Sequence, residues 1–228
     1  MSPSAIRNSR RGFALSDAWR QFWKHPSPLM LGSTFVVALT ARIIVGDWRI
    51  SDLVVPVVMV ATFPFLEWMI HVCILHWRPL HVGRLTIDPL VARKHRAHHR
   101  DPRKMPQVFI PWQVTVWLIP AVVAIGLLAF SRLGLGLTYI VFAVAQGLVY
   151  EWIHHLIHTD YRPKTFVYRS IWRNHRLHHF KNERYWFTVT SSGTAERVLR
   201  TYTDLASVPT SPTAKNLLGG PHESAATR

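Results

Sequence analysis

The stretch of sequence that decides the fold is residues 133–158, LGLGLTYIVFAVAQGLVYEWIHHLIH. It is apolar for most of its length, and about 20 apolar residues are enough for a helix to cross the hydrocarbon core of a bilayer. Its last turns carry one glutamate and three histidines. Ionisable side chains at such a depth are costly and tend to be functional. The stretch therefore predicts a membrane helix that delivers histidines to one membrane surface.

Three other apolar stretches have a similar length, at residues 29–45, 53–75 and 114–130. Pro56, Pro64 and Pro120 would kink these helices, which neighbouring helices can accommodate in a membrane. Short connections join the first stretch to the second and the third to the fourth. The expected fold class is an all-α membrane protein, with four transmembrane helices in two hairpins and a wholly helical cytosolic cap.

Basic residues predict the orientation in the membrane. The chain of 228 residues has 27 Lys and Arg against 12 Asp and Glu, a net charge of +15. Of these 27 residues, 24 lie before the first stretch, between the second and third, or after the fourth. The positive-inside rule places those regions, including both termini, in the cytoplasm. A soluble protein with this charge would suggest nucleic acid, but the separation of basic from apolar segments favours a membrane protein without a nucleic-acid partner.

Ten of the fourteen histidines fall into four groups. The groups are His71-x4-His76, His95-x2-His98-His99, His154-x3-His158 and His175-x2-His178-His179. Residues three or four apart share a helix face, so every group except the first can point one way. His71 and His76 are five apart, about 140° around an ideal helix. They converge only if the helix ends or bends between them.

Each HxxHH group follows a span that ends in paired histidines, so all four groups can meet in one cap against the membrane. Neutral imidazole suits zinc, copper, iron and nickel, and a structural zinc site closes with four ligands. Ten histidines exceed that number, so we expect a di-metal site that shares nine or ten nitrogens. A redox-active pair beside a membrane would fit dioxygen activation, although the ligands alone permit zinc as well as iron.

Four histidines fit no group. His25, His81 and His222 are expected to be non-ligands, and His155 is expected to support the ligands or to lie exposed.

Two carboxylates precede the paired histidines by one helical turn, Glu67 before His71 and Glu151 before His154. A ligating histidine usually gives its other N–H to a carboxylate, a carbonyl or water. Both glutamates are therefore expected to orient ligands. Tyr150 is grouped with them at the expected substrate edge, where interfacial anchoring is its simplest role.

These residues form a recognisable set of motifs. The segments are 67–76 EWMIHVCILH, 93–99 RKHRAHH, 147–158 GLVYEWIHHLIH, 174–180 NHRLHHF and 187–190 FTVT. In order and spacing they resemble the fatty acid hydroxylase/sterol desaturase superfamily of integral membrane di-iron oxygenases, over roughly residues 55 to 195. The pattern is nearest to bacterial fatty acid hydroxylase-like members, which makes a bacterial inner membrane the expected location.

The resemblance implies that ten histidines bind two iron ions, which zinc can replace in purified protein. The implied ligands are His71, His76, His95, His98, His99, His154, His158, His175, His178 and His179. No catalytic residue beyond these ligands is implied. Family members use dioxygen and two electrons to hydroxylate, desaturate or demethylate lipids. The expected activity is therefore hydroxylation of a fatty acyl or related lipid, with electrons from a separate ferredoxin, cytochrome or reductase.

Two alternatives stay open: a sterol- or carotenoid-type hydroxylase or desaturase of the same superfamily, and a histidine-rich metal-binding or transport membrane protein without redox activity.

The expected organisation has three parts. Residues 1–28 form a cytosolic segment with an interfacial amphipathic helix, and residues 29–205 form the membrane and catalytic domain that resembles fatty acid hydroxylases. Residues 206–228, rich in Pro, Ser, Thr and Gly, form a disordered tail.

Overall fold

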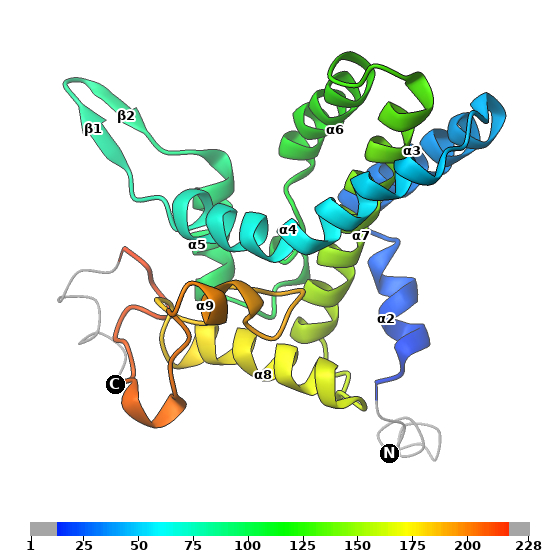
Figure 1. Cartoon of the computed structure of the whole chain (residues 1–228). Coiled ribbons are helices and arrows are strands. Elements are labelled where there is room, and N and C mark those ends of the chain that lie inside the picture. Colours follow the sequence, from blue (N-terminus) through cyan, green and yellow to red (C-terminus); the bar gives the residue numbers. More distant parts are fainter. Residues whose placement is uncertain (1–12, 219–228) are drawn as a thin grey trace, which may run out of the picture.

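The computed structural model describes residues 13–218, which are mostly helical (Figure 1). The elements are, in chain order, α2 (Leu15–Phe22), α3 (Pro26–Val45), η1 (Ile50–Leu53), α4 (Val54–Ile70), η2 (His71–Leu75), β1 (Leu80–Val82), β2 (Leu85–Ile87), α5 (Leu90–Arg100), η3 (Met105–Gln107), α6 (Trp112–Leu128), α7 (Leu133–His158), α8 (Phe166–Phe180), α9 (Thr194–Val198) and η4 (Leu205–Ser207). The element η2 is a π-helix, and the other η elements are 3-10 helices.

Within residues 13–218, four helical stretches are long and apolar enough to cross a membrane. They are Pro26–Val45, Ile50–Leu75, Met105–Leu128 and Leu133–His158. This confirms the predicted all-α membrane fold with four spans. The last span, α7, is central and packs against α3, α4 and α6. The helices α5, α8 and α9 lie together on one side of the spans and form the cap (Figure 1).

The second span is the one least covered by the rest of the described protein. Only 6% of its most apolar window is buried, against 17% to 39% for the other three spans. Its exposed side chains include Val54, Val57 and Val60. Such a face is stable when lipid tails cover it, because they are as apolar as the side chains.

The helices α6 and α7 cross at glycines. A Cβ atom added to Gly136 would lie 1.9 Å from the carbonyl oxygen of Gly126, which is far inside any possible contact. Small residues allow the backbones of membrane helices to approach this closely. The two glycines therefore fix the position of α6 along α7.

A buried charge network joins the two hairpins at the end of the spans away from the cap. Arg42 in α3 is 1% exposed, and it forms an ion pair of 3.0 Å with Asp52. Arg42 also donates a hydrogen bond of 2.8 Å to Thr138 in α7. Asp52 forms a second ion pair with Arg132, next to the start of α7. The basic residue inside the first apolar stretch is thus paired, as a charge at membrane depth must be.

The predicted amphipathic helix is α2, and it packs on the protein as well as facing outward. Phe22 is buried against Trp152 of α7, while Trp19 remains 52% exposed. The ring of His155 hydrogen-bonds to the carbonyl oxygen of Ala18 at 3.1 Å. His155 is therefore fully buried and holds α2 against α7, so the option that it lies exposed is wrong.

Two parts of the cap differ from the sequence expectations. The strands β1 and β2 form an antiparallel hairpin where we expected only helix. Residues 206–218 were expected to be disordered, but they pack on the cap. The side chains of Val208 and Ala214 in this segment are buried. Glu183 also accepts a hydrogen bond of 2.6 Å from the hydroxyl of Thr213. Residues 219–228 lie outside the described part of the chain.

Candidate metal centre

The π-helix η2 lets the first histidine pair converge. The amide of His76 hydrogen-bonds to the carbonyl oxygen of His71 at 3.1 Å, the five-residue bond that defines a π-helix. In an α-helix two side chains five residues apart would diverge. Here their ring centroids are 5.0 Å apart. The bend that the sequence required is thus a wider helical turn at the end of the second span.

The ten histidines of the four groups form two clusters, each with five ring nitrogens within 4.8 Å of one another. Cluster one contains His71, His76, His95, His99 and His178. Cluster two contains His98, His154, His158, His175 and His179. Eight of the ten side chains are buried, and only His76 and His158 are partly exposed. Both clusters lie where the second and fourth spans meet the cap.

The two clusters interlock through the HxxHH groups. The outer pair of the first group, His95 and His99, belongs to cluster one, and its middle member His98 belongs to cluster two. The second group is divided the opposite way, with His178 in cluster one. Each half of the chain thus supplies four ligands to its own cluster and one to the other. Neither cluster can be complete unless α5 and α8 are packed together.

Nitrogen separations within each cluster match those of ligands around one ion. In cluster one, the Nε2 atom of His95 lies 3.1 Å from those of His71 and His99. In cluster two, the Nε2 atom of His175 lies 3.2 Å from that of His158 and 3.0 Å from that of His179. Adjacent nitrogens bound at about 2.1 Å, at a right angle, would be about 3.0 Å apart. The five donors in each cluster therefore fit a metal ion.

Unpartnered nitrogens support the same assignment. The Nε2 atoms of His76, His98, His154 and His178 are buried without a hydrogen-bond partner among the described residues. A buried polar atom of this kind is costly unless something binds it. Among the ten clustered rings, those of His99 and His178 also have their second nitrogen fixed, as metal ligands usually do.

Backbone carbonyls do this orienting. The Nδ1 atom of His99 lies 2.9 Å from the carbonyl oxygen of Ala214, and that of His178 lies 2.8 Å from the carbonyl oxygen of Tyr185. With Nδ1–H donating to a carbonyl, Nε2 carries the free lone pair toward the cluster. Sequence reasoning missed both partners, because a carbonyl oxygen is common to every residue and leaves no signal in the sequence.

Burial keeps the ligands of the cap in the neutral form that binds metal. Burial, followed by repulsion from His99, lowers the pKa of His76 to about 3. Burial lowers the pKa of His99 to about 4, against a smaller opposite effect of the Ala214 carbonyl. Burial and then repulsion among the rings also hold the pKa well below 6.5 for His95, His98, His175, His178 and His179.

Glu67 anchors a loop rather than a ligand. Its carboxylate accepts hydrogen bonds from the amides of Val189 and Thr190 and, at 2.6 Å, from the hydroxyl of Thr190. That loop carries Phe187, whose ring centroid is 5.4 Å from those of His71 and His76. Glu67 therefore holds an aromatic cover over cluster one, and no hydrogen bond joins it to a ligand histidine among the described residues.

Glu151 has the equivalent place beside cluster two. Its carboxylate accepts a hydrogen bond of 2.8 Å from the amide of Ile110 and one of 2.6 Å from the hydroxyl of Ser27. It joins the start of α3 and the segment before α6 to α7, one turn before His154. The ring centroid of Tyr150, the third residue of this predicted set, lies 5.7 Å from that of the ligand His154.

His25 and His81 belong to neither cluster. His25 precedes α3 and stacks on Phe109 at 4.0 Å. His81 is exposed on the β1–β2 hairpin and lies 3.0 Å from the hydroxyl of Thr86. His222 lies outside the described residues.

A further buried acid, Glu196, was not predicted from the sequence. Its carboxylate accepts a hydrogen bond of 2.9 Å from the amide of Thr188 and fixes the loop that covers cluster one.

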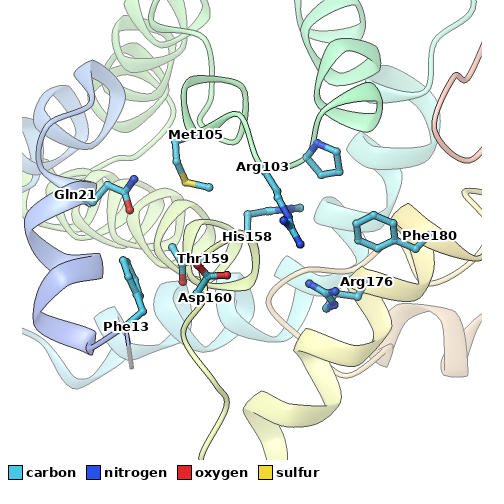
Figure 2. A pocket seen from close by; sticks show the side chains of 10 residues that line it. Phe13, Gln21, Arg103, Met105, His158, Thr159, Asp160, Arg176 and Phe180 are labelled. Carbon is cyan, nitrogen blue, oxygen red and sulfur yellow. The ribbon is translucent and has the colours of Figure 1, made fainter. Parts of the chain in front are cut away.

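The partly exposed ligands each face a polar pocket. A pocket of about 220 Å³ reaches His158 of cluster two (Figure 2). Arg103, Asp160 and Arg176 line it, together with apolar side chains such as Phe180. A second pocket, of about 130 Å³, reaches His76 of cluster one and is lined by three arginines. Arginines thus outnumber carboxylates beside both open edges, by two to one in the first pocket and by three to one, with Glu183, in the second.

Comparison with known proteins gives one family. The family model described as "Fatty acid hydroxylase" matches residues 56–201, a range that contains all ten clustered histidines as well as Glu67 and Glu151. No curated protein and no solved structure matches the chain.

Proposed function

This chain belongs to the fatty acid hydroxylase family, and we propose that it is a membrane-bound di-iron oxygenase that hydroxylates a fatty acyl or related lipid. The observation that carries the proposal is the pair of interlocked five-histidine clusters at the cap ends of the second and fourth spans. The overall reaction would be R–H + O2 + 2 e⁻ + 2 H⁺ → R–OH + H2O, with both electrons supplied by a separate donor.

Iron is the proposed metal because the reaction needs redox chemistry. A bound iron pair would supply the oxidant for an unactivated C–H bond, which no side chain provides. Imidazole nitrogen is a suitable donor for iron and equally for zinc. The choice of iron therefore depends on the family and on the reaction, and the donor set is compatible with it.

The protein's own part is to hold and shield the site. The clustered histidines provide ten nitrogens, and the carbonyls of Ala214 and Tyr185 fix two of the rings. Phe187, on the loop that Glu67 holds, packs against two rings of cluster one and would shield a metal bound there. A dry and rigid surrounding of this kind controls the reactivity of a metal site.

A lipid substrate fits the position of the site. The ligands begin at the last residues of two spans, so both clusters lie at the level where the hydrocarbon ends. The second span, which carries His71, is also the one least covered by the rest of the described protein. A long-chain substrate could therefore approach from the bilayer with its chain still among lipid tails.

An acidic electron carrier fits the opposite, polar side. His158 is one of the two ligands that reach the surface, and Arg103 and Arg176 flank it (Figure 2). Opposite charges accelerate the encounter of proteins and make it dependent on ionic strength. We propose that a ferredoxin, cytochrome or reductase docks over this pocket. The distribution of Lys and Arg favours a cytoplasmic cap and cytoplasmic termini, and the resemblance to bacterial members favours a bacterial cell.

The test is a comparison of total lipids from cells with and without the gene, grown under ¹⁸O-labelled dioxygen. A product that carries one labelled oxygen atom would support hydroxylation and would identify the lipid, including a sterol or carotenoid. A product that lacks two hydrogens and carries no label would indicate desaturation instead. If no lipid changes in an oxygen-dependent way, the proposed reaction is wrong and the metal-binding or transport alternative gains support.

A further inference from the structure

The β1–β2 hairpin has one entirely aliphatic face. Its register pairs Leu80 with Ile87 and Val82 with Leu85. Directly paired residues, and residues two apart along a strand, share one face of a sheet. All four side chains are exposed, by 48%, 40%, 57% and 63% in that order. The opposite face carries His81 and Thr86, whose side chains lie 3.0 Å apart.

Such a hairpin is a poor structure for water. An isolated two-stranded hairpin is at best marginally stable in water and needs its apolar face packed against something. A contiguous exposed aliphatic face usually marks a contact with a partner or a membrane. In the described residues no helix covers this face, and Figure 1 shows the hairpin extending away from α5 and the rest of the cap.

The hairpin starts at the membrane surface. The second span ends at Leu75, and β1 begins only five residues later at Leu80. The base of the hairpin is fixed to the protein, because the indole of Trp77 donates a hydrogen bond of 3.2 Å to the carbonyl oxygen of Ile87. Arg96 of α5 forms an ion pair of 2.6 Å with Asp88 at the end of the hairpin. Its direction relative to the span is therefore set.

The charges of the hairpin suit an anionic surface. Arg78 precedes β1 and Arg84 lies in the turn, and both are exposed. Residues 78–87 contain no carboxylate. Arginine next to aliphatic side chains is the pattern of interfacial elements, in which the apolar groups enter the acyl region and the cations remain at the phosphates.

We propose that the aliphatic face of the β1–β2 hairpin inserts into the interfacial layer of an anionic lipid monolayer, with Arg78 and Arg84 at the level of the phosphates. This contact holds α5 at a fixed depth through Arg96, which follows the clustered His95 directly in the chain. The inference rests on the membrane spans and does not depend on the proposed reaction.

The experiment measures the depth of the two hairpin faces. In a Cys73→Ala background, which removes the only cysteine, single Leu85→Cys and Thr86→Cys variants carry a nitroxide spin label. The full chain is reconstituted into vesicles that contain phosphatidylglycerol. We expect the label at position 85 to lie about 5–10 Å inside the headgroup boundary. It should be relaxed mainly by dissolved oxygen, and its neighbour at position 86 mainly by a water-soluble nickel chelate.

The matched pair also covers the other outcomes. Equal accessibility of both labels to the nickel chelate would overturn the proposal, since the hairpin would then lie in water. Both labels could instead be protected from the nickel chelate, with spectra that are broadened in labelled protein alone and sharpen when unlabelled protein is mixed in. A second copy of the chain would then cover the face, and the proposal would also be wrong. Elution as one symmetric peak and an unchanged metal content show for each variant that the label has not disturbed the fold.

Discussion

Replacing Glu67 should open the loop over cluster one without touching a ligand. In Glu67→Ala the amides of Val189 and Thr190 would lose their acceptor, although both groups remain enclosed. Each buried donor left unpaired costs about 1–3 kcal/mol, so the closed loop should be destabilised by about 2–6 kcal/mol. At about 1.4 kcal/mol per factor of ten, hydrogen exchange of these amides should accelerate by roughly 30-fold to 20,000-fold.

The substitution Glu67→Gln separates the hydrogen bonds from the charge. Glutamine keeps one carbonyl oxygen that can accept from both amides, so it should lose only the charge-assisted part of the bonds. Exchange should accelerate much less than in the alanine variant. Glu151→Ala is the matched control, because that carboxylate accepts from Ile110 beside cluster two instead. It should accelerate exchange at residue 110 and leave residues 189 and 190 unchanged.

The assay is hydrogen–deuterium exchange with mass spectrometry on protein in detergent or nanodiscs, together with metal content after exposure to a chelator. Phe187 would move with the loop and admit water to His71 and His76. Glu67→Ala should therefore release metal from cluster one first. Unchanged exchange at residues 189 and 190 would refute the anchoring role of Glu67. Equal effects of the alanine and glutamine variants would refute its explanation by hydrogen bonding.

Three further predictions concern stability and pH. Asp52→Asn leaves Arg42 buried without its counter-ion and should lower the free energy of unfolding by about 3–5 kcal/mol. The melting temperature should then fall by about 6–20 °C. The control Asp47→Asn, at the exposed end of the network, should cost less than about 1 kcal/mol. Gly136→Leu, which places side-chain atoms on the backbone of Gly126, should separate α6 from α7 and yield aggregated protein by size-exclusion chromatography; a monodisperse variant of normal stability would contradict the crossing. Burial lowers the pKa values of the cap ligands below 6.5, so below that pH the unfolded chain binds more protons than the folded one. Stability and metal retention should therefore be complete above about pH 6.5 and decline as the pH falls below it. Metal content that stays constant from pH 8 to pH 4 would contradict this.

The spans and the set of grouped histidines could be predicted because each depends on local pattern. Four apolar stretches of sufficient length predict four helices, and histidines three or four apart predict shared faces. The convergence of His71 and His76 could be stated only as a condition, since nothing in the sequence distinguishes a helix end from a π-helix. The structure supplies the answer in η2.

The division of ligands between the clusters could not be predicted. His95, His98 and His99 share one helix face, so local geometry favours one site for all three. Their assignment to different clusters comes from the packing of α5 against α8, which is a long-range property. For the same reason the hydrogen-bond partners of Glu67 and Glu151 could not be predicted from the sequence. Spacing placed Glu67 one turn from a ligand, but its partners are more than 120 residues away in the chain.

Other differences follow from contacts that composition does not reveal. Residues 206–218 have the composition of a disordered tail, yet the carbonyl oxygen of Ala214 orients His99 and two aliphatic side chains of the segment are buried. The β1–β2 hairpin is short enough to be hidden in a basic loop. The alternation of aliphatic and polar residues within 80–82 and 85–87 is the sequence signal for its two strands.

In the proposed enzyme each five-histidine cluster holds one iron ion. The most direct measurement is the number of redox-active iron atoms per chain in protein produced with ample iron and purified without oxygen. Two irons per chain, one for each cluster, is the result that we predict. One metal per chain, or two zinc ions that resist exchange for iron under reducing conditions, would contradict the claim.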